Sequence, residues 1–464
     1  MKSIKFGTDG WRAIIAEDYT LSNVRRIASG TAIWMKQKGM TSAVIGHDCR
    51  FGGRMFLEET AKTMAAHGIA VLAAQGFVST PMVSLGVIRH AAGLGVVITA
   101  SHNPPSYNGF KLKSSYGGPT IPSDIAEVEG LIPEDFVLPE VSYETYCQQG
   151  LISHVDLEAE YLDHVACHFD LSRLQAFRGI AYDAMYGAGQ RIMQQILPQL
   201  KAFHCEYNPG FGHTPPEPIT RNLSEIMQFL AAHPGQYIGI ANDGDADRIA
   251  MMDDRGRMVD SHHILLLLVQ YLHVHKKMTG KIVVSFSVTN KLKKLADHYR
   301  LDTIITKIGF KYIAEYMIRE DVLVAGEESG GLAIKGHIPE RDGVWIGLTI
   351  LEFMAVTGKT LQQLIDEVYD IVGAFSYDRH DLHLTASDKE KVQQRLSQQR
   401  IASFGPYEVR NYENLDGDKY YLDNDAWIMY RLSGTEPVLR IYAQGQHEEE
   451  VNNLLQWARA AVMG

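Results

Sequence analysis

Short apolar runs that end in polar or glycine-rich turns, each followed by a helical pattern, recur along this chain and constrain its fold most. Residues 42–46 (SAVIG) lead into His-Asp-Cys-Arg, and residues 95–99 (GVVIT) lead into Ser-His-Asn-Pro-Pro; residues 179–182 and 281–286 follow the same scheme. Strands that alternate with helices form parallel or mixed sheets, whose ligands bind at the carboxyl ends of the strands. The pattern therefore predicts an α/β protein built from repeated units.

The breaks in this pattern divide the chain. Its 464 residues are enough for roughly two to four domains. An acidic, proline-containing connector covers residues 132–144, a turn is expected near residues 254–257, and the pattern breaks again near residues 372–379. We expect four domains, covering residues 1–150, 151–256, 257–373 and 374–464.

Composition excludes several classes of protein. The net charge is −11 and no dense Lys/Arg stripe occurs, so we expect no nucleic-acid partner. The four cysteines form no CxxC pair, which disfavours a zinc knuckle and is typical of a reduced protein. The N-terminus has no apolar signal region, and the longest aliphatic run, residues 264–269, is too short to cross a bilayer. We expect a cytoplasmic protein without a membrane partner.

The acidic segment Asn-Asp-Gly-Asp-Ala-Asp-Arg at residues 242–248 is the most specific local signal. Asp243, Asp245 and Asp247 follow a predicted strand at alternate positions, and oxygen-only ligands suit hard cations such as Mg²⁺. An EF-hand loop would need glycine where Arg248 stands. The remaining alternative is a solvated acidic turn. A metal held by three carboxylates would keep positions open for a phosphate oxygen.

A second candidate is Ser101, which a predicted strand delivers into a turn that Pro104 and Pro105 keep from being helical. A hydroxyl at a strand end can act as a nucleophile if a base or metal activates it. Lys111 follows in a glycine-containing loop. The alternative is a turn or helix cap, and the Gly-x-Ser-x-Gly elbow of Ser-His-Asp hydrolases is absent from the sequence.

Three weaker segments could bind anions or sugar hydroxyls. Residues 326–331 (GEESGG) place carboxylates and a hydroxyl between glycines, and residues 431–437 (RLSGTEP) combine small residues with an arginine. Residues 6–12 (FGTDGWR) end in Arg12, and Arg50 could supply a further cation. Each of these alone is as compatible with an ordinary polar turn or a surface arginine.

The motifs FGTDGWR, TASHNPPSYNGFK, DGDADR, GEESGG and RLSGTEP occur in this order. In both order and approximate spacing, the chain resembles the α-D-phosphohexomutase family over essentially its full length. The resemblance implies four domains around a central cleft, the first three with a related mixed α/β core and the fourth a smaller α/β domain. It also implies interconversion of hexose 1-phosphates and hexose 6-phosphates.

The resemblance implies roles for individual residues. Ser101 would be a phosphoserine that exchanges its phosphoryl group with the substrate through a bisphosphorylated sugar, which also acts as an activator or intermediate. Asp243, Asp245 and Asp247, with an oxygen of phosphorylated Ser101, would hold Mg²⁺. Arg12 and Arg248 would bind near that phosphate, and Lys111 would help to deprotonate the sugar hydroxyl, directly or through its field. The substrate-binding residues would be Lys311, Glu327, Ser329, Arg341, Arg431, Ser433, Gly434, Thr435 and Arg440.

One departure from the family bears on the sugar. Gly331 stands where many bacterial phosphomannomutase/phosphoglucomutases have a histidine, so His337 or Arg341 would replace the missing acid/base group. This favours glucose, with phosphomannomutase and phosphoglucosamine mutase as alternatives within the family. A non-catalytic sugar-phosphate sensor and a Mg²⁺-dependent phosphatase are alternatives from other classes. Small sugar phosphates are the expected partners, and the chain would be a monomer or homodimer.

Overall fold

The structure is a computed structural model that describes residues 4–137, 139–177, 179–398, 400–432 and 438–463. The chain divides into two compact units. One contains residues 1–283 and 309–364, and the other contains residues 284–308 and 365–464.

The first sheet is mixed, with the strand order β1-β5-β4-β2-β3-β6. Strands β4, β2, β3 and β6 pair in this order and run parallel, whereas β5 is antiparallel to both β4 and β1. The strands are β1 (Trp11–Ile14), β2 (Ser42–His47), β3 (Ala70–Ala74), β4 (Leu94–Ile98), β5 (Tyr107–Ser114) and β6 (Ile152–Val155). Strand β6, which begins just after residue 150, pairs with β3 at the edge of this sheet.

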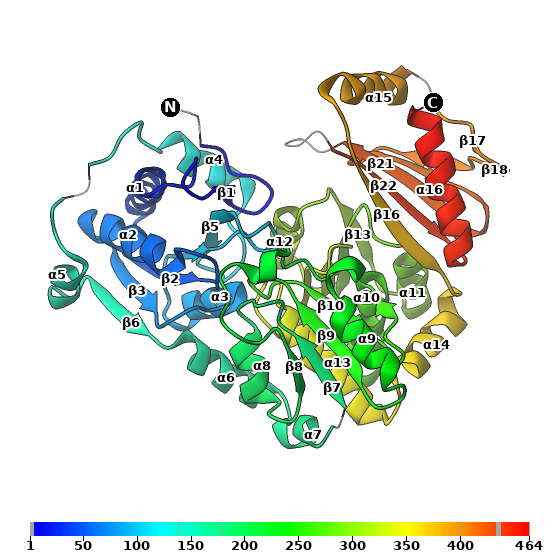
Figure 1. Cartoon of the computed structure of the whole chain (residues 1–464), viewed down its shortest axis with the longest axis horizontal. Coiled ribbons are helices and arrows are strands. Elements are labelled where there is room, and N and C mark those ends of the chain that lie inside the picture. The colour runs from blue at the N-terminus through cyan, green and yellow to red at the C-terminus, as the bar shows by residue number, and fades with distance from the viewer. Residues whose placement is uncertain (1–3, 138, 178, 399, 433–437, 464) are drawn as a thin grey trace. The chain divides into compact units, whose positions relative to one another are not determined.

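Helices cover both faces of the first sheet (Figure 1). Alternating residues of β2 divide between two cores, since Ala43 and Ile45 pack with helices α1, α2 and α4, whereas Val44 faces Gly86 of α3. Strands buried on both faces read as continuous apolar runs, which is why SAVIG is recognisable as a strand. The helices are α1 (Leu21–Gln37), α2 (Gly53–Ala66), α3 (Thr80–Arg89), α4 (Pro122–Gly130), α5 (Tyr143–Gln148) and α6 (Leu157–His168).

The second sheet has the order β11-β10-β9-β7-β8 and the third the order β13-β12-β14-β15. The first three sheets share one order of four neighbouring strands: the second strand of the unit, then the first, the third and the fourth. These strands are β3-β2-β4-β5, β8-β7-β9-β10 and β13-β12-β14-β15. This shared order confirms the repeated α/β units expected from the sequence. The strands are β7 (Ile180–Asp183), β8 (Lys201–Phe203), β9 (Ile238–Asn242), β10 (Ile249–Met252), β11 (Met258–Val259), β12 (Lys281–Ser285), β13 (Thr303–Thr306), β14 (Val322–Gly326) and β15 (Leu332–Ile334).

Helix α8 ends at Ile196, because Pro198 offers no N–H to continue the helix. The aliphatic run at residues 264–269 is a buried part of α10. The helices are α7 (Leu171–Ala176), α8 (Gln190–Ile196), α9 (Ser224–Ala232), α10 (Ser261–Gln270), α11 (Lys291–Tyr299), α12 (Phe310–Arg319), α13 (Gly343–Thr357) and α14 (Leu361–Val372).

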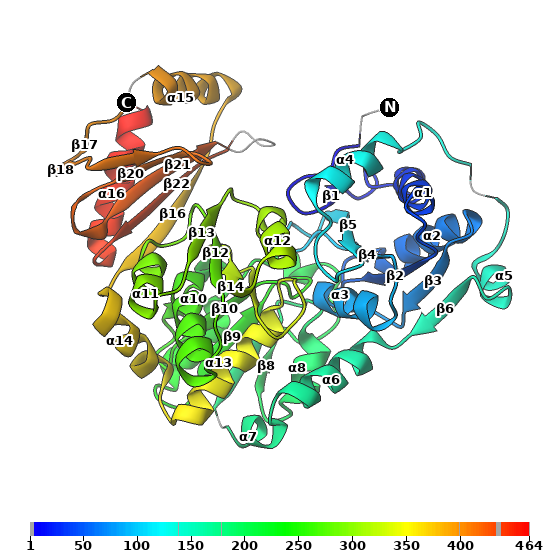
Figure 2. The same ribbon diagram turned by 180° about the vertical axis from the view of Figure 1, so that it is seen from behind.

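A fourth, antiparallel sheet has the order β16-β22-β21-β20-β19. Helices α15 and α16 pack on one of its faces, and Trp427, Met429 and Tyr442 of the other face pack against Phe286. Figure 1 shows α16 in front of β21 and β22, and Figure 2 shows the strands from behind. The elements are β16 (Ser376–His383), α15 (Ala386–Gln398), β17 (Ser403–Phe404), β18 (Tyr407–Glu408), β19 (Asn411–Glu413), β20 (Asp418–Tyr421), β21 (Trp427–Leu432), β22 (Val438–Gly445) and α16 (Glu448–Met463).

Among the described residues, no single helix has both the length and the apolar character to cross a membrane. Only α13 and α14 taken together reach that length and composition, and they are bent by 88°.

Candidate active site

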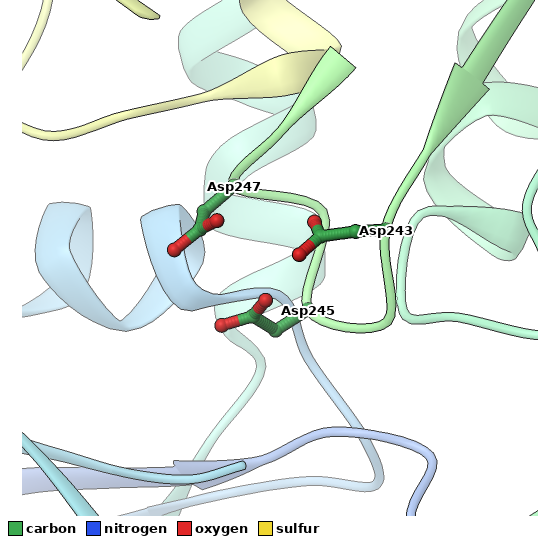
Figure 3. Close-up of side chains that lie close together, drawn as sticks. All are labelled: Asp243, Asp245 and Asp247. Carbon is green, nitrogen blue, oxygen red and sulfur yellow. The ribbon is translucent and has the colours of Figure 1, made fainter. Parts of the chain in front are cut away.

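Three aspartates converge in the loop between β9 and β10. Figure 3 shows Asp243, Asp245 and Asp247 turned toward one another from this loop, and one oxygen of each lies within 4.8 Å of the others. All three residues are buried. The loop closes through Ala246, whose φ of 56° lies in the left-handed region. Antiparallel β9 and β10 hold both ends of the loop, so the acidic triplet has a fixed geometry.

The charges of this cluster are not balanced by hydrogen bonds alone. Burial, together with Asp245 and Asp247, raises the pKa of Asp243 well above its usual range. Among the described residues, the Oδ1 atoms of Asp245 and Asp247 are buried and have no hydrogen-bond partner. Buried carboxylate oxygens without donors are costly unless a cation meets them. The donor set, oxygen only and threefold negative, fits a hard divalent cation.

Ser101 lies beside this cluster, although it is 142 residues away from Asp243 in the chain. It follows β4, is buried, and has a φ of 52°. Its Oγ donates a hydrogen bond to Asp243 Oδ2 at 2.6 Å, and its N–H donates to Thr99 Oγ1 at 2.8 Å. The structure thus brings together the hydroxyl and the acidic triplet that the sequence singled out.

Lys111 reaches the same cluster from β5. Its Nζ lies 2.6 Å from Asp9, 2.8 Å from Asp245 and 3.0 Å from Asp247. Burial alone would lower the pKa of Lys111, but these carboxylates outweigh it and raise that pKa. These carboxylates therefore favour the charged form of Lys111.

Three arginines surround the cluster. Arg341 contacts Asp247 at 2.7 Å and Asp9 at 2.9 Å. Arg12 donates to Asn103 Oδ1 at 2.6 Å in the loop that carries Ser101, and lies 3.3 Å from Asp9. Arg248 is half-buried, and its Nε has no hydrogen-bond partner among the described residues. These guanidinium groups give the site the local cations that an acidic chain needs to bind an anion.

The predicted sugar-binding residues lie on a second set of loops in the same unit. Glu327 is buried and accepts a hydrogen bond from the N–H of Gly309 at 2.7 Å. Burial and the neighbouring Glu328 raise the pKa of Glu327 to about 7. Ser329 is half-buried. Lys311 lines a cavity of about 210 Å³ together with the N-terminal loop that contains Asp9.

His337 lies in a different environment. Its Nε2 is 2.9 Å from Asp342 Oδ2, its ring stacks on Trp345 at 3.8 Å, and its Nδ1 is 3.2 Å from His164 Nε2. The Asp342 carboxylate also accepts a hydrogen bond from Tyr161. All these partners belong to α6 or α13, or cap α13. The contacts named here therefore connect His337 to these two helices, and none of them involves the acidic triplet.

The other unit holds the remaining predicted residues. Arg431 and Arg440 stand directly opposite each other on β21 and β22. Like charges in this position repel unless an anion or carboxylate compensates them. Arg431 lies 3.4 Å from Asp416, and Arg440 lies 3.9 Å from Asp381. The residues predicted to complete this phosphate loop lie outside the described part of the chain: they are Ser433, Gly434 and Thr435.

Sequence reasoning misses two partners of the site and misjudges a third. Asp9 belongs to the segment FGTDGWR, but nothing local shows that it meets Lys111 and Arg341. Thr80, at the start of α3, donates its hydroxyl to Asp245 Oδ2 at 2.5 Å and carries no sequence signal. The prediction that Arg50 is available as a cation is wrong, because its guanidinium is bound to backbone carbonyls and is fully buried.

This chain is similar in sequence and in structure to known proteins. The chain matches phosphoglucomutase/phosphomannomutase alpha/beta/alpha domain I over residues 3–136, domain II over 159–256, domain III over 260–372 and the C-terminal domain over 390–460. It is 28% identical to a phosphoglucomutase/phosphomannomutase of Thermococcus kodakarensis, covering 97% of this chain and 96% of that protein. It is also 28% identical to a phosphoglucosamine mutase of Methanococcus maripaludis, covering 97% and 96%. A solved structure assigned as a phosphomannomutase, from Thermus thermophilus, is 31% identical and superposes with a TM-score of 0.88 over 100% of both chains.

The four domains and these likenesses define a class of enzyme, the intramolecular phosphotransferases that act as isomerases. Within that class, the chain belongs to the phosphoglucomutase/phosphomannomutase family, the α-D-phosphohexomutases.

Proposed function

We propose that this protein interconverts hexose 1-phosphate and hexose 6-phosphate, with glucose favoured, in the cytoplasm. The observation that carries the proposal is the 2.6 Å contact between Ser101 Oγ and Asp243, beside a buried triplet of aspartates. Phosphorylated Ser101 gives its phosphoryl group to a sugar hydroxyl, so that the serine P–O bond breaks and a sugar P–O bond forms. The hydroxyl loses its proton in this step, and the leaving Ser101 Oγ gains one. The resulting bisphosphorylated sugar turns over and returns its other phosphoryl group to Ser101.

Asp243, Asp245 and Asp247, with an oxygen of the phosphoserine, would hold Mg²⁺. When bound, the ion would neutralise charge on the transferring group. Lys111 would help to remove the proton of the attacking hydroxyl, directly or through its positive field. Arg12 and Arg248 bind the phosphoserine side of the site. Their positions around Asp9 and Asp243 support these roles.

Two sets of residues would bind the substrate. Glu327 and Ser329 bind the sugar hydroxyls with Lys311 as a further substrate-binding residue, and either His337 or Arg341 takes the place of the histidine that Gly331 replaces. The non-reacting phosphate is bound by Arg431, Ser433, Gly434, Thr435 and Arg440. The paired placement of Arg431 and Arg440 supports an anion site. The four domains proposed above would each supply one of these loops, whether the chain is a monomer or a homodimer.

The preference for glucose rests on Gly331, and phosphomannomutase and phosphoglucosamine mutase activities fit the family equally well. Incubation with glucose 1-phosphate, mannose 1-phosphate and glucosamine 1-phosphate, following both the 6-phosphates and free phosphate, separates these activities. Release of free phosphate alone would identify a phosphatase. Binding without turnover of any of the three sugars would identify a sensor.

A further inference from the structure

Arg50, which follows β2, has a guanidinium that is wholly enclosed by the loop carrying Ser101. The side chain is 0% exposed. It donates hydrogen bonds to four backbone carbonyls of that loop, at distances of 2.5 to 3.0 Å: those of Ser101, Asn103, Pro104 and Tyr107. The ring of Phe211 lies 5.0 Å from the guanidinium carbon. The two terminal nitrogens of Arg50 therefore donate to the backbone and do not face a ligand site.

Asp48 anchors this arrangement from the end of β2. Its Oδ1 accepts the N–H of Arg50 at 2.9 Å, and its Oδ2 lies 3.3 Å from the Nε of Arg50. The same Oδ2 accepts the hydroxyl of Thr99 at 2.5 Å, and the hydroxyl oxygen of Thr99 accepts the N–H of Ser101 at 2.8 Å. Both backbone polar groups of Ser101 are therefore connected to the buried carboxylate of Asp48. Thr99 makes the connection for the N–H, and Arg50 makes it for the C=O.

The backbone of Ser101 needs such support. A φ of 52° is unfavourable for a residue with a side chain, and it persists only where the surroundings over-determine it. This conformation accompanies the 2.6 Å contact of the hydroxyl with Asp243. A small displacement of a reacting group is enough to reduce the rate of a reaction about 100-fold.

We infer that Arg50 is a positioning residue for Ser101: it fixes the left-handed conformation that aims the hydroxyl at the acidic triplet, and it does not bind substrate phosphate. The inference rests on the proposed function, because it assumes that Ser101 carries the phosphoryl group. Lysine cannot replace Arg50, since its single ammonium point charge cannot match a planar fork that serves four carbonyls.

The test compares Arg50→Lys and Arg50→Gln with wild type and with Arg54→Gln. Arg54 lies nearby on α2, but its side chain is 84% exposed and pairs with Glu58 on the surface. The measured quantity is the single-turnover rate at which glucose 1,6-bisphosphate phosphorylates the dephosphorylated enzyme. Alongside it, KM, kcat, Mg²⁺ affinity by calorimetry and the thermal midpoint are recorded.

Both Arg50 variants are expected to lose about 100-fold in the phosphorylation rate and in kcat, with KM and Mg²⁺ affinity within about threefold of wild type. Arg54→Gln is expected to match wild type. An Arg50→Lys variant that is phosphorylated at the wild-type rate would overturn the inference. A rise in KM with unchanged kcat would also overturn it, because that result would mean that Arg50 binds substrate.

If both Arg50 variants fail to fold, Thr99→Val supplies the second test. It removes the acceptor of the Ser101 N–H and leaves the guanidinium in place. A folded Thr99→Val protein is expected to show a slower phosphorylation rate with unchanged KM. A wild-type rate would refute the claim that the Asp48–Thr99–Arg50 network fixes the backbone of Ser101, and with it the positioning role of Arg50. Failure of the proposed function is distinguishable, since wild-type protein itself would then take up no phosphoryl group at Ser101.

Discussion

The buried ion pair between Lys113 on β5 and Glu340, just before α13, offers a quantitative test of how the site is held. The two side chains are 0% exposed, and Lys113 Nζ lies 2.5 Å from Glu340 Oε2. At an effective dielectric constant of ~20, unit charges at this distance attract by about 7 kcal/mol. Desolvation of each ion costs several kcal/mol, so the net contribution of the pair is small, whereas an ion left alone is strongly destabilising by ~3–5 kcal/mol.

The structure predicts that the two single substitutions differ. In Lys113→Met, Glu340 still accepts the N–H of Arg341 at 3.0 Å and lies 3.6 Å from its Nε, so we expect a loss of about 3 kcal/mol. In Glu340→Met, the Lys113 ammonium has no other hydrogen-bond or ion-pair partner among the described residues, so we expect about 5 kcal/mol. The double variant Lys113→Met/Glu340→Met should lie within about 1–2 kcal/mol of wild type, because no charge is left unpaired.

Thermal unfolding followed by calorimetry checks this cycle. At about 2 °C per kcal/mol for a large unit, the single variants should lower the midpoint by roughly 6 °C and 10 °C. The double variant should recover most of that loss. Additive losses of stability in the double variant, or single variants with unchanged midpoints, would refute the reasoning that each of the two buried charges compensates for the other.

Three further predictions follow from the charges of the described residues. Asp247→Asn should weaken Mg²⁺ binding by at least tenfold in a calorimetric titration, because one of three buried anionic ligands is lost; unchanged affinity would mean that the ion is held elsewhere. Burial against Phe286, Tyr421 and Trp427 lowers the pKa of Lys419 to about 7, below its usual 10.5, so the native state binds fewer protons between these values and stability should fall as pH drops from 9.5 to 7; Lys419→Met should flatten this slope in the thermal midpoint, and an unchanged slope would contradict the assignment. Arg431→Gln should raise KM for glucose 1-phosphate about tenfold while kcat falls less, since a phosphate clamp acts in ground state and transition state alike; loss of kcat with KM unchanged would place Arg431 at the reacting phosphate.

Local patterns are sufficient to predict the fold where strands are buried on both faces. SAVIG and GVVIT form β2 and β4, and the polar residues that follow them form the loops at the strand ends. The acidic triplet is also predictable, because all three carboxylates lie in one short loop between two strands. Short range is what makes these features visible.

Contacts between distant segments are not predictable from one sequence. Asp9 contacts Lys111, Thr80 contacts Asp245 and Glu340 contacts Lys113 only because segments far apart in the chain pack together. Each of the three residues is ordinary in its local context. For Arg50 the error is of the opposite kind. The sequence suggests that it is a free cation beside a candidate site, but in the fold it donates hydrogen bonds to backbone carbonyls. The sequence does not reveal these contacts, because every residue carries a backbone carbonyl whatever its side chain.

The central claim, that Ser101 carries the phosphoryl group, is tested most directly by intact-mass analysis. Dephosphorylated protein and its Ser101→Ala variant are incubated with glucose 1,6-bisphosphate and Mg²⁺, and the site of any added phosphoryl group is mapped by peptide fragmentation. The account predicts one phosphoryl group on Ser101 of the wild-type chain, none on the variant, and loss of mutase turnover in the variant. Equal phosphorylation of both proteins, or turnover by Ser101→Ala at the wild-type rate, would contradict it.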